Sequence, residues 1–361
     1  MAVTEDDCLK LTAYFGERDR TGGRLLGDAL MDIFGTHSLR TSILLRGAEG
    51  FGRLHHLHTD RLLSLSEDLP VVAVAVDRRD RIEGLLAPVL EVTSRGLITL
   101  ERARLLGGPI AEVRLPQPLH EATKLTVYVG RRERIAGRPA YAALCELLYR
   151  RGIAGATVLL GVDGTRDGRR ARARFFGANA DVPTMVMAVG DGASVAGVLP
   201  ELGELLPDPL ITLERVRVCK RDGRLLARPH HLPAGDERGL GLWQKLTVYT
   251  SQAATVGGRP VHLEIIRRLR GARSAGATSL RGIWGFHGDH PPRGDRFLQI
   301  RRHVPVLTIS VDTPQRTAET FDIIDELTAE HGLVTSEMVP AMRALSEERS
   351  VGGLELASFD F

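Results

Sequence analysis

Three copies of one strand pattern set the organisation of this chain. They occupy residues 10–14, 124–128 and 245–249, and each reads Lys-Leu-Thr-(Ala or Val)-Tyr. Apolar residues alternate with Lys, Thr and Tyr, which is the period of a β-strand with two different faces. The chain has 48 basic residues but only four lysines, and three of those four stand at this one position. The position therefore favours a compact ammonium group over a guanidinium group.

Each copy of the strand opens a repeat of domain length. A Gly-Arg pair, two glycines three residues apart, a proline at the start of an apolar strand and a last strand ending in Glu follow in the same order each time. The Gly-Arg pairs are Gly23-Arg24, Gly137-Arg138 and Gly258-Arg259, and the paired glycines are Gly47 and Gly50, Gly161 and Gly164, and Gly282 and Gly285. The period of roughly 115 to 120 residues is longer than that of solenoid repeats and fits a domain. We predict domains over 7–106, 123–219 and 244–340, and a tail over 341–361.

The first repeat predicts strands and helices in a fixed order. Strands are expected over Cys8–Phe15, Thr41–Leu45, Val71–Val76 and Leu97–Arg104, and helices over Arg24–Phe34 and Arg81–Ser94. The order βαββαβ is that of the ferredoxin-like fold, so the sequence predicts an α+β protein of three tandem ferredoxin-like domains. After the third domain we expect a short helix over Ala341–Arg349 and a loosely structured end over Ser350–Phe361.

The third strand of each repeat is apolar almost throughout, over 71–76, 184–189 and 306–311. A strand in a sheet with one wet face should alternate instead. Both faces of this sheet are therefore expected to be covered, one by the two helices and the other by the neighbouring repeats.

The repeated lysines have two explanations. In the ferredoxin-like order the fourth strand lies beside the first, so Lys10, Lys124 and Lys245 should each face the glutamate that ends the fourth strand: Glu101, Glu214 and Glu337. A buried ion pair at a domain interface is the first explanation, because buried charges are usually paired. Contact of the lysines with a ligand is the second.

The motifs together resemble a known family. Lys-Leu-Thr-x-Tyr, Gly-Arg at the first helix, Ala-Thr-x-Leu-x-Gly-x-x-Gly and the Leu-Pro start of the third strand are similar to those of the family called domain of unknown function 190, a PII-like group. Repeat 1 resembles it most closely, through 44–52, His58-Thr59 and 65–70. Repeats 2 and 3 depart from the pattern between their second and third strands.

The resemblance implies a ferredoxin-like fold and a trimeric form. PII-like proteins typically form homotrimers with small-molecule sites in the clefts between subunits and a loop after the second strand that contacts partners. Three fused copies would look like an intramolecular pseudo-trimer, so we expect a monomer in solution. Members of the family are often encoded near fluoride channels, which makes a membrane channel or transporter a candidate partner.

Three sets of residues are candidate ligand contacts. The Gly-x-x-Gly turns either let a phosphate approach backbone amides or simply end a strand before a loop. Arg24, Arg138 and Arg259 at the first helix either bind an anion or form salt bridges. The three lysines of the first strands complete the set.

The loops after the paired glycines are basic in all three repeats. They contain Arg53, His55, His56, His58 and Arg61 in repeat 1, Arg166, Arg169, Arg170, Arg172 and Arg174 in repeat 2, and His287, His290, Arg293, Arg296, Arg301, Arg302 and His303 in repeat 3. They are either solvated loops or a surface for a partner or an anion. Histidines 55, 56 and 58 are a weak metal candidate, because no carboxylate or cysteine ligand accompanies them.

The remaining composition sets limits on function. The three scattered cysteines predict reduced thiols, and together with an acidic, polar N-terminus they predict a cytoplasmic protein. The first and third strands lack the aromatic pattern of an RNA-binding sheet, so we expect no nucleic-acid partner. No motif for a nucleophile, a nucleotide-hydrolysing loop or a zinc protease is present, so we expect no enzyme and no metal cofactor.

We therefore expect a non-enzymatic PII-like sensor that binds an anionic small molecule, with an adenine nucleotide as the candidate, between repeats. An ion-handling protein that uses the histidine loop, or a partner-binding scaffold, is the alternative. Because repeat 1 keeps the family-like glycine run, the cleft lined by Gly47, Gly50, Arg53 and His58 is expected to bind best.

Overall fold

The computed structural model describes residues 3–52, 57–59, 68–107, 122–166, 168–171, 182–287, 291–294, 304–346 and 349–359. Repeat 1 contains β1 (Val3–Gly16), β2 (Arg20–Thr21), β3 (Arg24–Leu25), α1 (Leu26–Thr36), β4 (Thr41–Arg46), β5 (Glu49–Phe51), β6 (Leu57–Thr59), β7 (Pro70–Arg78), α2 (Arg79–Gly84), α3 (Leu86–Val92) and β8 (Gly96–Gly107). The single helix expected before the last strand is two helices, because the regular helical pattern is interrupted at Leu85, whose N–H donates to the carbonyl oxygen of Ile82 three residues back (3.2 Å).

Repeats 2 and 3 follow the same order. Repeat 2 contains β9 (Ala122–Gly130), β10 (Arg134–Ile135), β11 (Arg138–Pro139), α4 (Ala140–Arg150), β12 (Gly155–Leu160), β13 (Asp163–Arg166), β14 (Arg169–Arg170), β15 (Pro183–Asp191), α5 (Gly192–Leu205), β16 (Leu210–Arg221) and β17 (Arg224–Leu225). Repeat 3 contains β18 (Trp243–Ser251), β19 (Thr255–Val256), β20 (Arg259–Pro260), α6 (Val261–Gly271), β21 (Ala277–Arg281), β22 (Trp284–His287), β23 (Arg293–Gly294), β24 (Pro305–Asp312), α7 (Pro314–Leu327) and β25 (Leu333–Val339). The chain is an α+β protein of three tandem repeats.

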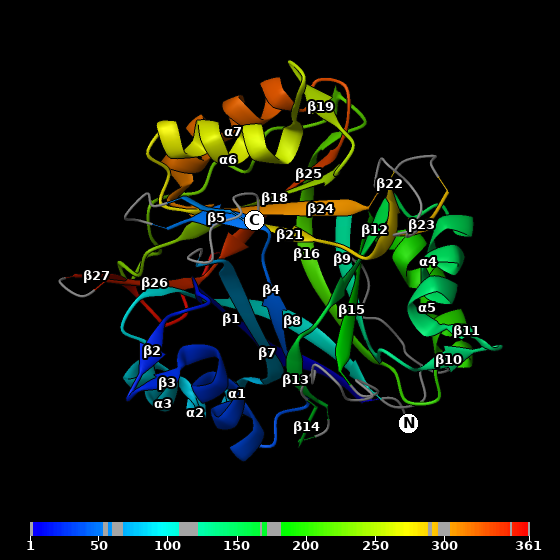
Figure 1. Ribbon diagram of the computed structural model, residues 1–361, viewed down its shortest axis with the longest axis horizontal. Coiled ribbons are helices and arrows are strands. Elements are labelled where there is room, and N and C mark those ends of the chain that lie inside the picture. The colour runs from blue at the N-terminus through cyan, green and yellow to red at the C-terminus, as the bar shows by residue number, and fades with distance from the viewer. Residues whose placement is uncertain are drawn as a thin grey trace.

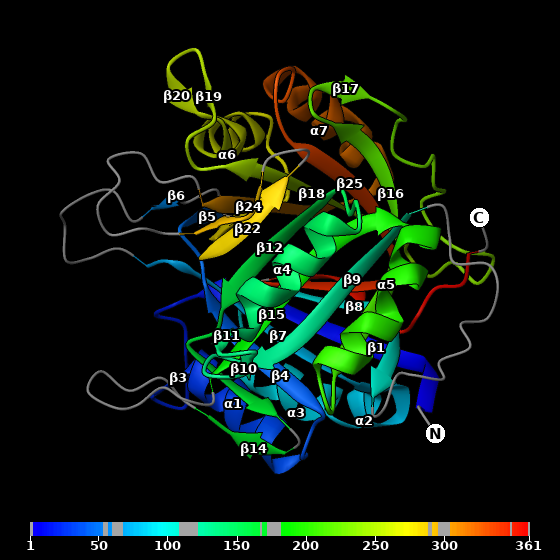
Figure 2. The same cartoon turned by 90° about the vertical axis from the view of Figure 1, so that its right-hand side faces the viewer.

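Each repeat builds a four-stranded antiparallel sheet in which the fourth strand lies beside the first, the first beside the third and the third beside the second. The order is β8–β1–β7–β4 in repeat 1, β16–β9–β15–β12 in repeat 2 and β25–β18–β24–β21 in repeat 3. Helices cover one face of each sheet. They lie at the outside of the molecule, and the three sheets meet in the middle (Figures 1 and 2).

The third strands confirm that both faces of each sheet are covered. In β7, Ala73 and Ala75 pack in the core under the helices of repeat 1, whereas Val72, Val74 and Val76 pack in a central core. That central core also takes Met185 and Met187 from repeat 2 and Leu307 from repeat 3, among others. The third strands are therefore apolar on both faces because one face packs under the helices and the other packs against the neighbouring repeats.

Two kinds of strand pairing join the repeats. In the first, the short strand that contains the second glycine of each pair binds to the second strand of another repeat: β5 pairs with β21, β13 with β4 and β22 with β12. In the second, the far end of each fourth strand, or the strand that follows it, pairs with the fourth strand of another repeat: β8 with β16, β16 with β25 and β26 (Ala341–Leu345) with β8. Each set joins repeat 1 to repeat 2, repeat 2 to repeat 3 and repeat 3 back to repeat 1, so the three repeats close into a ring.

The C-terminal segment is not the helix expected over 341–349, and its end is not loose. Ala341–Leu345 forms β26, because β8 presents a free edge at Gly96–Leu100 that this segment pairs with. A second strand, β27 (Ser350–Gly353), pairs with β26. Leu356 and Ala357 are buried, and Nη2 of Arg102 donates a hydrogen bond to the carbonyl oxygen of Ala357 (2.9 Å). Strand pairing with repeat 1 has overridden the local helical pattern.

Candidate functional site

The three repeated lysines meet at the centre of the molecule. Within each repeat the lysine lies opposite the glutamate predicted to face it, and the Nζ–Oε2 distances are 3.0 Å for Lys10 and Glu101, 3.1 Å for Lys124 and Glu214, and 2.9 Å for Lys245 and Glu337. These pairs confirm the register-based prediction.

Each lysine also pairs with a glutamate of another repeat. Lys10 donates to Glu214, Lys124 to Glu337 and Lys245 to Glu101. The six side chains therefore alternate in sign around a closed cycle, which we call the axial ring. The sequence predicted the pairs within repeats but missed those between repeats, because they depend on how the three sheets are placed.

The axial ring is buried, so its charges depend on one another. Burial alone would lower the pKa of Lys10 and Lys245, but the neighbouring glutamates outweigh it and raise both. Burial would raise the pKa of Glu101 and Glu337, and the lysines outweigh it and lower both. Lys124 is the most enclosed of the lysines, with 2% of its side chain exposed, and there burial lowers the pKa despite two carboxylates.

The axial ring does not resemble a metal site. One oxygen from each of Glu101, Glu214 and Glu337 lies within 4.8 Å of the others. Three ammonium groups sit between these carboxylates and offset their charge, which leaves no excess negative charge for a cation. The ring is best explained as the polar core that fixes how the repeats associate.

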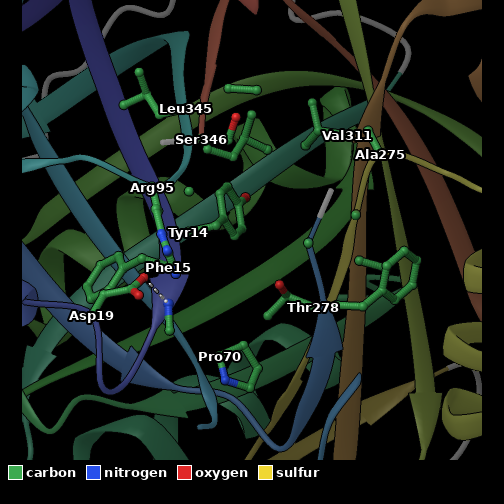
Figure 3. A pocket seen from close by; sticks show the side chains of 18 of the residues that line it. Tyr14, Phe15, Asp19, Pro70, Arg95, Ala275, Thr278, Val311, Leu345 and Ser346 are labelled. Carbon is green, nitrogen blue, oxygen red and sulfur yellow. Dashed lines mark hydrogen bonds between the residues drawn. The ribbon is translucent and has the colours of Figure 1, made fainter. Parts of the chain in front are cut away.

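A cavity of about 450 Å³ lies between repeats 1 and 3 (Figure 3). Repeat 1 supplies the end of β1, the end of β5 and the starts of β7 and β8. Repeat 3 supplies the start of β21 and the second half of β24, and the strand β26 that follows it completes the wall. Its lining residues are Tyr14, Phe15, Gly16, Asp19, Phe51, Gly52, Asp68, Pro70, Arg95, Gly96, Leu97, Ala275, Gly276, Ala277, Thr278, Ile309, Val311, Met342, Ala344, Leu345 and Ser346. A cavity of this size suits a small organic molecule.

The lining combines an apolar interior with a few charged groups. Tyr14, Phe15 and Phe51 offer aromatic surface opposite the aliphatic residues of β24 and β26. Asp19 accepts a hydrogen bond from the backbone N–H of Gly16 (2.8 Å), and Asp68 accepts one from the N–H of Arg18 (2.6 Å). Arg95 is the cation of the lining. Such a site can hold a molecule with a flat or apolar body and a polar end.

Tyr14 lies between this cavity and the axial ring. It lines the cavity, and it belongs to the Lys-Leu-Thr-x-Tyr strand that also carries Lys10. Burial raises its pKa, and Lys245 and Glu101 of the axial ring act on it as well. Its hydroxyl is therefore neutral at every ordinary pH and can donate a hydrogen bond.

Comparison with known proteins identifies the family. The DUF190 family, described as "Uncharacterized ACR, COG1993", matches residues 8–105, 122–218 and 243–341. The chain belongs to this family. A UPF0166 protein of Aquifex aeolicus (strain VF5) is 32% identical over 66 residues, which cover 18% of this chain and 69% of that protein.

Among solved structures, aspartate kinase from Synechocystis aligns with 96% of this chain and 46% of its own, at 12% identity. This chain thus spans about half of that protein's length. The TM-score of 0.25 is too low to indicate a shared fold.

The paired glycines of the DUF190 repeats lie where the chain passes close to other backbone, and the second glycine of each pair lies at a joint between repeats. A β-carbon at Gly50 would lie 2.7 Å from the carbonyl oxygen of Ala277 in repeat 3, and one at Gly164 would overlap that of Ser42 in repeat 1. At Gly285 it would overlap the carbonyl oxygen of Ala156 in repeat 2. The first glycines, Gly47, Gly161 and Gly282, are equally close to the proline that starts the third strand of their own repeat. Glycine is required here because two backbones pass side by side.

The three arginines of the Gly-Arg pairs precede the helices by two residues and lie in the short strands β3, β11 and β20. Each pairs with an acidic residue of the helix that follows. Arg24 pairs with Asp32, Arg138 with Glu146 (2.7 Å) and Arg259 with Glu264 (3.7 Å). Their side chains are more than half exposed. This placement favours the salt-bridge explanation over the anion site.

The predicted repeat 1 cleft is only partly described. Gly47 and Gly50 lie at the joint, whereas the neighbouring Phe51 and Gly52 reach the cavity. Arg53, His55, His56 and Arg61 lie outside the described residues, and so does the side chain of His58 in β6. The metal alternative therefore stays a prediction.

None of Asp19, Asp68, Arg95 or the residues of β26 was predicted from the sequence as a ligand contact, and Asp68 was included only within the family-like segment 65–70. They come from four separate segments, and no spacing rule joins them. The available signal was Tyr14, an aromatic residue at the same place in all three repeats. Among the described residues, no helix is long and apolar enough to cross a membrane.

Proposed function

We propose that this protein is a non-enzymatic, PII-like sensor that binds a small molecule between its first and third repeats. The cavity of about 450 Å³ carries this proposal, because both repeats supply its walls. A ligand there would contact two repeats at once. Its affinity would therefore depend on how the two repeats associate, and its binding would in turn change that association.

We propose further that the three repeats are ferredoxin-like domains that form an intramolecular pseudo-trimer. The strand order, the closed ring of strand pairings and the axial ring support this, since each recurs once per repeat. A site between neighbouring repeats then corresponds to the subunit clefts of PII-like trimers.

The ligand is a molecule with a flat or apolar body and an anionic group, and an adenine nucleotide is the first candidate. Its ring would lie against Tyr14 and Phe51, and its anionic group would contact Arg95. Asp19 and Asp68 already accept backbone hydrogen bonds, and their charge disfavours a long polyphosphate. Nucleoside monophosphates are therefore better candidates than triphosphates. The regulated partner, with a membrane channel or transporter as the candidate, would contact the basic loops after the second strands.

Calorimetry with AMP, ADP and ATP tests the proposal. AMP should bind with a stoichiometry of one, and Arg95→Ala should weaken it by about tenfold to a hundredfold, the usual range for a hydrogen bond to a charged group. Arg151→Ala is the matched control, because Arg151 pairs with Glu201 on the surface of repeat 2 (2.7 Å) and is absent from the cavity lining. Equal affinity of wild type and Arg95→Ala, or no binding of any of the three nucleotides, would contradict the proposal.

A further inference from the structure

Tyr14, Leu97 and Ala344 lie side by side on adjacent strands and form what we call the floor of the cavity. This floor has a counterpart between repeats 2 and 1. In the cavity, Tyr14 lies opposite Leu97, and Leu97 lies opposite Ala344 of repeat 3. In repeat 2, Tyr128 lies opposite Leu210, and the pairing of Ile211 with Leu106 places Gly107 of repeat 1 next to Leu210. Gly107 therefore stands where the cavity has Ala344.

One wall of the two clefts can be matched in the same way. Ala275 lines the cavity, and its backbone N–H donates to Oδ2 of Asp312 (2.9 Å). The backbone N–H of Arg40 donates to Oδ2 of Asp77 at the same distance, 2.9 Å. The strand pairings agree, because Ala277 pairs with Phe51 as Ser42 pairs with Thr165. Arg40 thus takes the place of the small residue Ala275.

The Arg40 side chain reaches across the cleft between repeats 2 and 1. A β-carbon added at Gly107 would overlap its Nη2 atom, so the guanidinium group lies directly on the floor. A second arginine fills the mouth. Arg166 stands where the cavity has Gly52, and it pairs with Glu133, the counterpart of Asp19, at 2.8 Å.

We infer that Arg40, assisted by Arg166, occupies the second cleft as an internal substitute for a ligand and restricts the protein to fewer open sites than it has repeats. Nε of Arg40 is buried and has no acceptor among the described residues. A buried donor without an acceptor reduces stability, so hydrogen bonding does not explain this placement. Filling the cleft does. The space that Arg40 would vacate fits an alkylguanidinium ion.

Chemical complementation tests the occupancy without any knowledge of the natural ligand. In Arg40→Ala, n-propylguanidinium should raise the melting temperature, because it restores the removed group, and a crystal structure should show a new cavity above Gly107. Wild type and Arg24→Ala, which removes an exposed arginine of the same repeat, should show no rise. Equal responses in all three proteins, or a cleft that collapses on Leu210 in the crystal, would overturn the inference.

The second arm rests on the proposed function and uses AMP as the probe. Arg40→Ala/Arg166→Gly should raise the stoichiometry from one to two. The reciprocal change, Ala275→Arg/Ala344→Gly, should abolish binding. The glycine at 344 is needed because the β-carbon of alanine there would overlap the new guanidinium group, as one at Gly107 would overlap Arg40. A stoichiometry of one in the first variant and unchanged binding in the second would overturn the inference. If wild type binds no AMP, the proposed function fails. The experiment with n-propylguanidinium then decides by itself whether Arg40 occupies the second cleft.

Discussion

The axial ring and the clefts between repeats have diverged to very different degrees. Around the axis each repeat supplies one lysine and one glutamate, at the same positions of the same strands. In the clefts, Ala275 and Ala344 of one correspond to Arg40 and Gly107 of another. Both regions lie at contacts between repeats, so position at an interface does not by itself explain the difference.

The number of repeats that share a side chain explains it better. Each axial lysine pairs with glutamates of two repeats, and each glutamate pairs with lysines of two, so the loss of one side chain removes an ion-pair partner from a buried charge of another repeat. A cleft involves two repeats, and a change there alters one site. In a fused chain the clefts can therefore specialise one by one, whereas the axis must stay alike.

The largest expected effect comes from breaking the axial ring. Lys124→Ala removes the ammonium group that lies between Glu214 and Glu337 and leaves both carboxylates buried. Removing one partner of a buried ion pair typically costs about 3–5 kcal/mol. The free energy of unfolding, measured by urea denaturation, should fall by that amount.

Lys220→Ala is the control for this change. Lys220 is the one lysine outside the axial ring, and its Nζ pairs with Oδ1 of Asp325 at 2.6 Å. A third of the Asp325 side chain is exposed, so water can solvate the carboxylate that remains. Lys220→Ala should cost clearly less than Lys124→Ala. Similar losses would mean that the ring is no more important than an ordinary ion pair at the edge.

Acid should weaken the stabilising contribution of the axial ring. Folding lowers the pKa of Glu101 and Glu337 below the ordinary 4.5, because the buried lysines outweigh the effect of burial. The stability these groups supply is present above pH 4.5 and is lost as the pH falls through their pKa in the folded state. Lys10 and Lys245 have raised pKa values, so their contribution is complete below pH 10.5.

The urea midpoint should therefore decline from pH 5 downward, and more steeply in wild type than in Lys124→Ala. In the variant, the glutamates have lost a cation that keeps them ionised. Parallel declines in the two proteins would show that other carboxylates dominate the acid response.

Local patterns predicted the element order within a repeat and the covering of each sheet by neighbouring repeats, but they did not predict which residues of different repeats meet. Strand alternation and repeat spacing were enough for the element order and for the pairing of Lys10 with Glu101, because register follows from the strand order. The pairing of Lys10 with Glu214 joins residues 204 apart, and the cavity joins β1 to β26. Ala341–Leu345 shows the limit most clearly, since a free edge of repeat 1 decides its conformation.

The smallest of these effects concerns the glycine joints, and it separates their structural role from a ligand role. In Gly164→Ala the new β-carbon would overlap the carbonyl oxygen of Ser42 and crowd Pro183, so β13 must shift against β4. Overpacking of this kind typically costs about 1–3 kcal/mol. Gly197→Ala is the matched control, because Gly197 is exposed in α5 with nothing within 4 Å of the added carbon, and there alanine should stabilise by about 0.5–1 kcal/mol. Urea denaturation should give opposite signs for the two variants, and AMP should bind Gly164→Ala as it binds wild type, since the joint of β13 with β4 lies away from the cavity. A loss of AMP binding without a loss of stability would instead assign the glycine a direct contact with the ligand.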